Sequence, residues 1–389
     1  MTSLTCPGLS GVLEYGGKMC TLAGVRSGCF AECLRKPGPF GASLGVARPL
    51  FDGDTAAFVA ARPESADQCF NHVKKCGACG KVCAASIANC NSCGASLAET
   101  PTSQSNNVFV GFIHGVARGP FPFKISTRLE TADTLVFDDP LACTPAHLCA
   151  IPTKVYVPTG LELFASPAQG AALLRRLEAS AWEAMRTQFL SDSAWRASTF
   201  AGSPTDEELR ASVAAGLNVP PSQFQLHLQY ILPPLLPQQF KMYRAGVHFT
   251  YERFLPLNWL LASLDALASQ NVSLPGLTDA PQLIRRVEEL APECSYAEAH
   301  AALYASVADS QQRHANWAPQ CFEYLVDDAT DTVVAALDAT GAIVALDASA
   351  QAPTAQALFD ADKKALQQYA KPAGAYYTHA KLDKLPTLA

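Results

Sequence analysis

The chain has 389 residues, of which 49% are hydrophobic and 16% charged, and its formal net charge is -6 at pH 7. Such a composition can bury a substantial core, which excludes an intrinsically disordered protein, and the length suggests two or three domains. The acidic balance argues against broad electrostatic attraction to nucleic acid or to an anionic membrane.

Five segments follow one another along the sequence. Residues 1–68 predict only a small irregular or β-rich segment, and residues 69–97 are dense in Cys. The polar, turn-forming stretch 98–107 is typical of a linker. Residues 108–270 combine short apolar strands with helices, and residues 271–389 predict a mostly helical extension.

Neither a membrane span nor a secretory signal is predicted from the sequence. No apolar run approaches the roughly 18 residues of a membrane span, and the N-terminus lacks the pattern of a secretory signal. We therefore expect a cytoplasmic protein, with a mitochondrial location as the alternative.

Hydrophobic periodicity predicts the individual elements within these segments. The strands expected are 109–117, 134–139, 147–157 and 224–230. The helices expected are 166–190, 256–270, 280–310 and 354–371, and a hairpin is expected at 332–347.

The cysteines are concentrated in the run CGACGKVCAASIANCNSCG, which contains two CxxCG units. A CxxC turn directs two thiolates at one metal, and the Gly that follows relieves strain where the backbone turns back. Four thiolates leave no open position on the metal. Cys76, Cys79, Cys90 and Cys93 therefore predict a structural zinc site, with unmetallated thiols as the alternative.

The segment FQLHLQY at 224–230 alternates apolar and polar residues. In a strand, Gln225, His227 and Gln229 would share one face while apolar side chains fill the other. A solvent-facing side of a sheet is one interpretation of this pattern. A functional site is the other, because buried polar groups require partners.

The same region resembles the histidine-triad (HIT) superfamily of nucleotide-binding proteins. The strings SQFQLHLQ, at 222–229, and TADTLVFDDPLACTPAHLCAIPTK, at 131–154, carry the resemblance. The first is similar to the H-x-Q transferase branch, which includes diadenosine tetraphosphate phosphorylases. The two motifs occur in the family's order, and the resemblance that they define covers roughly residues 108–260. The resemblance implies an α+β fold with an antiparallel sheet and helices, preceded here by the zinc ribbon and followed by the helix-rich extension.

The resemblance also implies a role for each matching residue. His227 would attack a phosphorus atom and form a nucleotidyl-histidine intermediate. Gln229 would hydrogen-bond the phosphate, and Gln225 occupies the first triad position. The remaining roles are substrate contacts, implied for Asp139 (ribose hydroxyls), His147 (flanking the site), and Asn218 and Ser222 (phosphate oxygens or leaving group).

Two departures from the family pattern keep a second function open. The first triad position is Gln rather than His. In addition, Val219-Pro220-Pro221 replaces the family's Gly-rich phosphate loop, and its two prolines have no backbone N–H. The chain is thus expected to be a nucleotidyl hydrolase or transferase acting on a dinucleoside polyphosphate or nucleotide-sugar-like substrate. The alternative is a non-catalytic nucleotide-binding or scaffold protein whose ribbon docks protein or RNA. A homodimer is possible in either case, and no membrane partner is expected.

Overall fold

The computed structural model gives an α+β protein whose central sheet is antiparallel. Every helix among the described residues is too short or too polar to cross a lipid bilayer. The residues that the structure describes are 13–15, 18–20, 51–78, 80, 82–85, 87–90, 95–118, 127–139, 142–235, 237–244, 246, 248–314, 323–327, 332–337, 343–344 and 384–388.

The central sheet has six strands in the order β13-β11-β12-β10-β9-β8. Each neighbouring pair is antiparallel, with β12 in the middle between β11 and β10. The bounds are β8 (Thr127–Glu130), β9 (Thr134–Asp138), β10 (His147–Pro152), β11 (Ala214–Asn218), β12 (Leu228–Ile231) and β13 (Phe254–Pro256).

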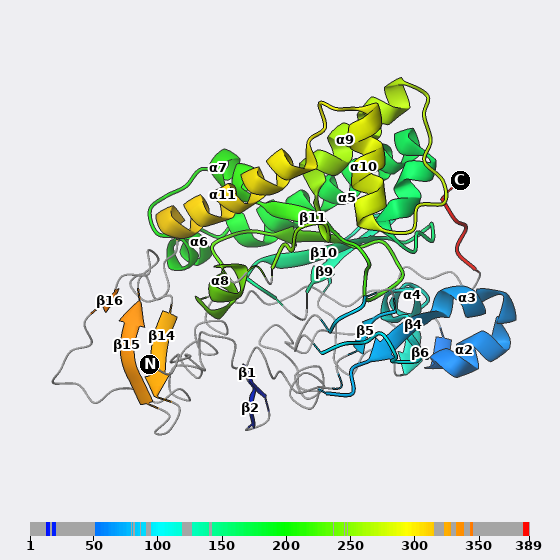
Figure 1. The fold of residues 1–389 in the computed structure, drawn as a ribbon, viewed down its shortest axis with the longest axis horizontal. Helices are drawn as coiled ribbons and strands as arrows, with labels where there is room; N and C mark the ends of the chain where they lie inside the picture. The colour runs from blue at the N-terminus through cyan, green and yellow to red at the C-terminus, as the bar shows by residue number, and fades with distance from the viewer. Residues whose placement is uncertain are drawn as a thin grey trace.

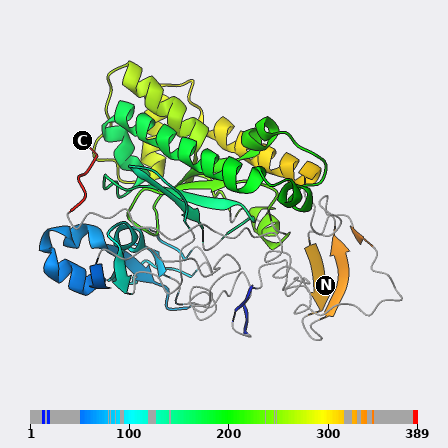
Figure 2. The same cartoon turned by 180° about the vertical axis from the view of Figure 1, so that it is seen from behind.

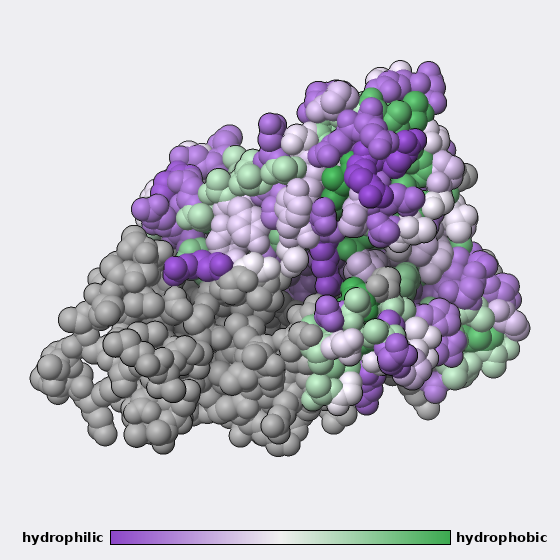
Figure 3. Space-filling model, in the orientation of Figure 1, coloured by the Kyte–Doolittle hydropathy of each residue, from purple (hydrophilic) through white to green (hydrophobic). Residues whose placement is uncertain are grey.

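Helices cover one face of this sheet, as Figures 1 and 2 show. The main core lies between the two layers, where α5 packs against α9 and against β10. Figure 3 shows a largely hydrophilic outer surface over α10, whose inner residues Leu283, Ile284 and Val287 are buried. The helices of this layer are α5 (Pro167–Met185), α9 (Leu257–Ser269), α10 (Ala280–Leu290) and α11 (Tyr296–His314).

A smaller N-terminal module covers part of the opposite face, at the end where β4 and α4 are labelled in Figure 1. A second core joins it to the sheet through Phe109, Phe137 and Cys149. The elements of this N-terminal module are β3 (Phe51–Asp54), α2 (Thr55–Ala61), η2 (Pro63–Ser65), α3 (Ala66–Cys69), β4 (Phe70–Lys75), β5 (Val82–Ala84), β6 (Thr102–Asn106), α4 (Val108–Ile113) and β7 (Val116–Arg118).

Two sequence expectations in this module are wrong. The supposed linker 98–107 contains β6, whose polar residues pair with β4 along its whole length. The supposed strand 109–117 begins as α4, because the Asn107 side chain caps a helix by accepting a hydrogen bond from Val110 N. The β7 strand then follows.

The helices expected at 166–190 and 256–270 are confirmed, and the helix expected at 280–310 is present with one interruption. A break at 291–295 divides the expected helix 280–310 into α10 and α11, and Ser295 Oγ accepts from Glu298 N at 3.3 Å as an N-terminal cap. Both helices pack on the same main core as α9, so the division expected between residues 270 and 271 does not separate two cores. The expected helix 354–371 lies outside the described residues.

The hairpin expected at 332–347 is present as the antiparallel pair β15 and β16. Its turn lies outside the described residues. The remaining elements are β1 (Leu13–Tyr15), β2 (Lys18–Cys20), η3 (Gly160–Ala165), η4 (Arg186–Leu190), α6 (Ser193–Thr199), α7 (Asp206–Ser212), α8 (Pro237–Arg244), β14 (Glu323–Asp327), β15 (Thr332–Leu337) and β16 (Ile343–Val344).

Candidate functional site

The segment around His227 keeps the expected alternation but is less regular than predicted. The β12 strand begins only at Leu228, so Gln225 and His227 precede it. Leu226, Leu228 and Tyr230 enter the core beneath the helices. His227 lies on the other side, where its ring meets Phe109 of α4 with centroids 5.1 Å apart.

The tautomer of His227 follows from a backbone contact. Its Nδ1 lies 2.8 Å from the carbonyl oxygen of Gln225. A carbonyl oxygen can only accept, so Nδ1 carries the proton and Nε2 of the neutral ring keeps its lone pair. Burial lowers the pKa of His227, against the raising effects of the Gln225 hydrogen bond and the Asp139 carboxylate. The ring is therefore held neutral with Nε2 as its basic nitrogen.

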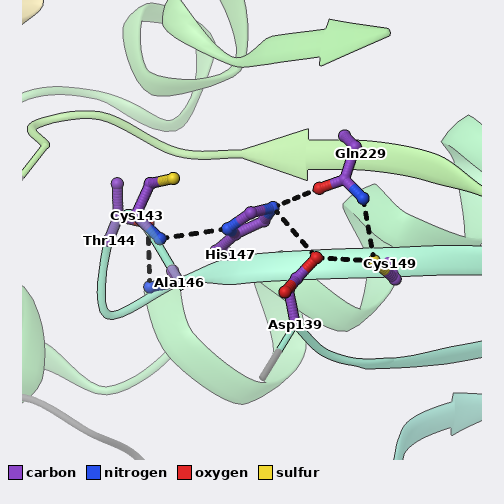
Figure 4. A network of polar contacts seen from close by, with 7 residues as sticks. All are labelled: Asp139, Cys143, Thr144, Ala146, His147, Cys149 and Gln229. Carbon is purple, nitrogen blue, oxygen red and sulfur yellow. Dashed lines mark hydrogen bonds and ion pairs between the residues drawn. The ribbon is translucent and has the colours of Figure 1, made fainter. Parts of the chain in front are cut away.

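A chain of hydrogen bonds links side chains of β10 and β12 to Asp139 (Figure 4). The N–H of Cys143 donates to His147 Nδ1 at 3.1 Å, so the proton of neutral His147 is on Nε2. That N–H donates to Gln229 Oε1 at 2.5 Å. Gln229 Nε2 donates to Cys149 Sγ at 3.2 Å, and the Cys149 thiol donates to Asp139 Oδ2 at 3.1 Å.

The direction of each bond in this chain is fixed by the one before it. The amide of Gln229 can present only its oxygen to His147, and therefore presents its N–H to Cys149. Asp139 closes the network, with Oδ2 at 3.7 Å from His147 Nε2. The structure thus brings together three of the expected residues, namely His147, Gln229 and Asp139.

Cys149 is the member of the network that sequence reasoning missed. It is 1% exposed, and burial followed by the nearby Asp139 carboxylate raises its pKa, so it remains a thiol that can donate. A signal was present in the sequence, because Cys149 follows His147 by two residues in the same strand and shares its face.

Gln225 is positioned for a structural role, in contrast to the catalytic role expected from its place in the triad pattern. Its side-chain N–H groups donate to the carbonyl oxygens of Pro152 and Val155 at 2.7 and 2.9 Å. Its oxygen accepts from Val157 N at 3.0 Å. Both amide donors are thus committed to backbone, which ties the segment before β12 to the segment after β10.

Asn218 and Ser222 flank the turn that follows β11. Asn218 ends this strand, as expected for the strand that leads to a phosphate loop, and Ser222 is exposed. Between them, Val219 N donates to Arg253 O at 2.8 Å, while Pro220 and Pro221 have no N–H. The Val219-Pro220-Pro221 turn therefore has no backbone N–H directed at a phosphate.

Part of the cysteine run is described. Cys76, Cys83 and Cys90 are buried in one small core with Leu97, and the sulfur atoms of Cys83 and Cys90 are 3.7 Å apart. Gly80, which follows the first CxxC pair, donates to Cys76 O, and its φ of 64° is the conformation that Gly permits.

Cys79 and Cys93 lie outside the described residues. Among the residues that are described, no group of three or more His, Cys, Asp or Glu is arranged to hold a metal ion. The four-thiolate ligand set therefore stays a prediction.

Comparison with known proteins gives a limited likeness. No family model matches the chain, and no curated protein matches it in sequence. Hnt3 in complex with DNA and guanosine has a TM-score of 0.27 at 16% identity, over 36% of this chain and 69% of that chain. The aprataxin ortholog Hnt3 from Schizosaccharomyces pombe has a TM-score of 0.26 at 18% identity, over 34% of this chain and 63% of that chain.

A third solved structure, aprataxin ortholog Hnt3 in complex with DNA, has a TM-score of 0.26 at 16% identity, over 44% of this chain and 90% of that chain. Values of this size define only a partial likeness in fold.

Proposed function

We propose that this chain is a nucleotidyl hydrolase or transferase of the HIT type, with His227 as its nucleophile. The observation that carries the proposal is the bond from His227 Nδ1–H to Gln225 O at 2.8 Å. It leaves the lone pair on Nε2, the nitrogen that must attack phosphorus, and burial keeps the ring neutral.

The reaction would proceed in two displacements. The Nε2 lone pair forms a bond to the α-phosphorus of the substrate, and the bond from that phosphorus to the leaving-group oxygen breaks, with its electrons remaining on the oxygen. Phosphate, or water that gives up a proton to the released leaving group or to solvent, then attacks the same phosphorus. The P–N bond breaks and its electron pair returns to Nε2, which restores the neutral imidazole.

The hydrogen-bond network would orient the groups around the reacting phosphate. Gln229 commits one N–H to Cys149, and its second N–H is assigned to a phosphate oxygen. Asp139 retains 13% side-chain exposure at the edge of the network, which fits a contact with ribose hydroxyls. Asn218 and Ser222 are assigned to the leaving group. Preorganised donors of this kind stabilise the charge that develops in the transition state.

The substrate class follows from this chemistry as a nucleotide joined through its α-phosphate to a good leaving group. Dinucleoside polyphosphates and nucleotide sugars are proposed first. The test incubates the full chain with these compounds, cap analogues and DNA bearing a 5′-adenylate, with and without phosphate. His227→Asn should remove turnover and the acid-labile nucleotidyl adduct, whereas His72→Asn, on an exposed position of β4, should retain both. Equal turnover by His227→Asn and wild type would overturn the proposal.

A second candidate is a nucleotide-binding protein without turnover. The Val219-Pro220-Pro221 turn favours it, because its one N–H is already bonded to Arg253 O. Calorimetric titration with the same compounds distinguishes the two candidates. Binding without product formation or adduct would replace the enzyme by this binding protein, whose cysteine module would then dock a protein or RNA partner.

We also propose a structural zinc ion held by Cys76, Cys79, Cys90 and Cys93. The burial of Cys76 and Cys90 in one core and the backbone bond from Gly80 to Cys76 support it. Zinc would supply folding free energy and no step of the reaction. Cys76→Ser should lower the zinc content measured by mass spectrometry, and Cys294→Ser, in the main core, should not. Unchanged zinc in Cys76→Ser would exclude the site.

A further inference from the structure

The segment immediately before His227 is held by the N-terminal module. Asn71 of β4 accepts a hydrogen bond from Phe224 N through Oδ1 at 2.9 Å. The same side chain donates through Nδ2 to Gln223 Oε1 and to Asn106 O, both at 3.1 Å. The Asn71 amide thus hydrogen-bonds both the backbone and a side chain of the catalytic segment, residues 223–227, which ends at His227.

Asn107 holds the other backbone group of Phe224. Its Nδ2 donates to Phe224 O and to Gln68 O, both at 2.9 Å. Its Oδ1 accepts from Val110 N and caps α4. Because the cap and the grip on Phe224 are made by one side chain, the start of α4 and the catalytic segment are placed together.

Gln223, which precedes Phe224, contacts the N-terminal module through its own side chain. Its Oε1 accepts from Val108 N at 2.9 Å, in addition to the bond from Asn71. Val108 is the first residue of α4, and the next residue, Phe109, packs on the His227 ring. The position of that ring contact therefore depends on the bond to Gln223.

These bonds are directional, and the two asparagines that make most of them are buried. Asn71 and Asn107 are each 0% exposed. Removal of either amide leaves a part-buried backbone group of Phe224 without that partner, and removal of Asn107 also leaves the buried N–H of Val110 without it. Leaving such a group without its partner is far more unfavourable than rearranging a surface bond. The segment ahead of His227 consequently has one favoured position.

We propose that Asn71, Asn107 and Gln223 form a positioning clamp, through which the N-terminal module sets the place of the His227 imidazole. None of the three contacts substrate in this scheme, so they are positioning residues. The catalytic consequence rests on the proposed function, whereas the placement of the ring does not.

Histidine-selective NMR of the full chain tests the clamp without any substrate. Asn71→Leu should move the His227 ring resonances and raise the measured pKa of His227 toward its ordinary value, because the loosened ring gains solvent. Gln68→Leu is the matched control, since Gln68 is also a buried amide of this module and bonds the Leu385 backbone at 2.7 and 3.0 Å. It should lower the melting temperature and leave His227 unchanged.

A second pair of variants addresses the case in which Asn71→Leu does not fold. Gln223→Glu keeps an oxygen that can accept from both Asn71 and Val108, whereas Gln223→Leu has none. The His227 resonances of Gln223→Glu should match wild type, and those of Gln223→Leu should be displaced. Identical spectra for Gln223→Leu and wild type, or an equal displacement in Gln68→Leu, would overturn the clamp.

Turnover adds a separate readout. If the panel of substrates identifies an activity, Gln223→Leu should lower kcat by about tenfold to a hundredfold with little change in KM, as expected for a misplaced reacting group. Gln223→Glu should restore it. An unchanged kcat in Gln223→Leu would contradict the clamp. If no substrate is turned over, the proposed function fails, and the NMR comparison still decides the clamp.

Discussion

At the scale of a residue, the position of one proton decides what His227 can do. The carbonyl of Gln225 holds that proton on Nδ1, and burial disfavours a second proton on Nε2. The reactive form should therefore persist to lower pH than in an ordinary histidine. We expect the acid limb of kcat/KM to fall only below about pH 6.5, the usual histidine value. A limb centred at or above 6.5 would contradict the burial argument.

The same residue links stability to pH. Its pKa is lower in the folded chain than in the unfolded chain, so the unfolded state binds the proton more readily. The contribution of neutral His227 is complete above about pH 6.5 and is lost as pH falls toward the lower folded value. Urea unfolding across this window should show a smaller loss of stability in His227→Asn than in wild type.

Cys149 gives a second prediction at this scale, because its thiol both accepts from Gln229 and donates to Asp139. Cys149→Ala removes both bonds and should lower the free energy of unfolding by about 1–3 kcal/mol. Cys149→Ser keeps a hydroxyl that can make both, and should lose less. Urea denaturation measures the order, and an alanine variant as stable as wild type would contradict the network.

At the scale of an element, sequence pattern predicted β9, β10 and β12 of the central sheet and the long helices α5, α9, α10 and α11, but not their ends. The alternation in 224–230 placed the apolar and polar side chains on the correct faces, yet β12 starts four residues later. The backbone of Phe224 bonds to Asn71 and Asn107 instead of to a neighbouring strand. No local pattern encodes partners more than a hundred residues away.

The segment 109–117 illustrates the same limit. Its apolar run fits a strand as well as a buried helix, and periodicity alone cannot separate them. The deciding groups are Asn107, which caps α4, and Gln223, which accepts from Val108 N. The first was visible in the sequence as a polar residue before the run, whereas the second lies more than a hundred residues away, shortly before His227.

Gly216 of β11 supports an element-scale prediction. A Cβ there would lie 2.4 Å from Leu255 O and 2.6 Å from the Phe254 ring, so β13 would have to move. Gly216→Ala should lower the free energy of unfolding by about 1–3 kcal/mol. Because Gly216 also pairs with Gln229, turnover should fall as well.

Gly77→Ala is the control for this prediction, since nothing lies within 4 Å of the added methyl group. It should change stability by no more than about 0.5 kcal/mol. Thermal and urea unfolding of the two variants measure the difference, and equal stability would show that β13 yields without strain.

At the scale of the whole molecule, the candidate site is assembled from parts that are distant in sequence. The sheet contributes Gln229 and the network around His147, the segment before β12 contributes His227, and the N-terminal module contributes Phe109 and the clamp. Motif spacing identified the sheet residues. It could not identify the module's contribution, because that depends on how two faces pack.

The segment 384–388 connects the same two parts at their edge. Leu385 exchanges two hydrogen bonds with the Gln68 side chain, and Pro386 O accepts from Tyr156 N at 2.6 Å. The Leu385 side chain is 3% exposed in the core that also contains Phe109 and Cys149. This segment therefore forms a further link between the N-terminal module and the sheet, in addition to the clamp at Phe224 and the contact at Phe109.

Leu385→Ala should consequently destabilise both parts together. The cavity left in this core should cost about 2–5 kcal/mol, measured by urea unfolding. Hydrogen exchange should accelerate at Gln68 and at Tyr156 to similar extents, because one side chain supports both. Leu388→Ala, at a half-buried position on the main core, is the control and should cost less. Faster exchange confined to one part would mean that the segment packs on that part alone, and that the clamp at Phe224 holds the two together without it.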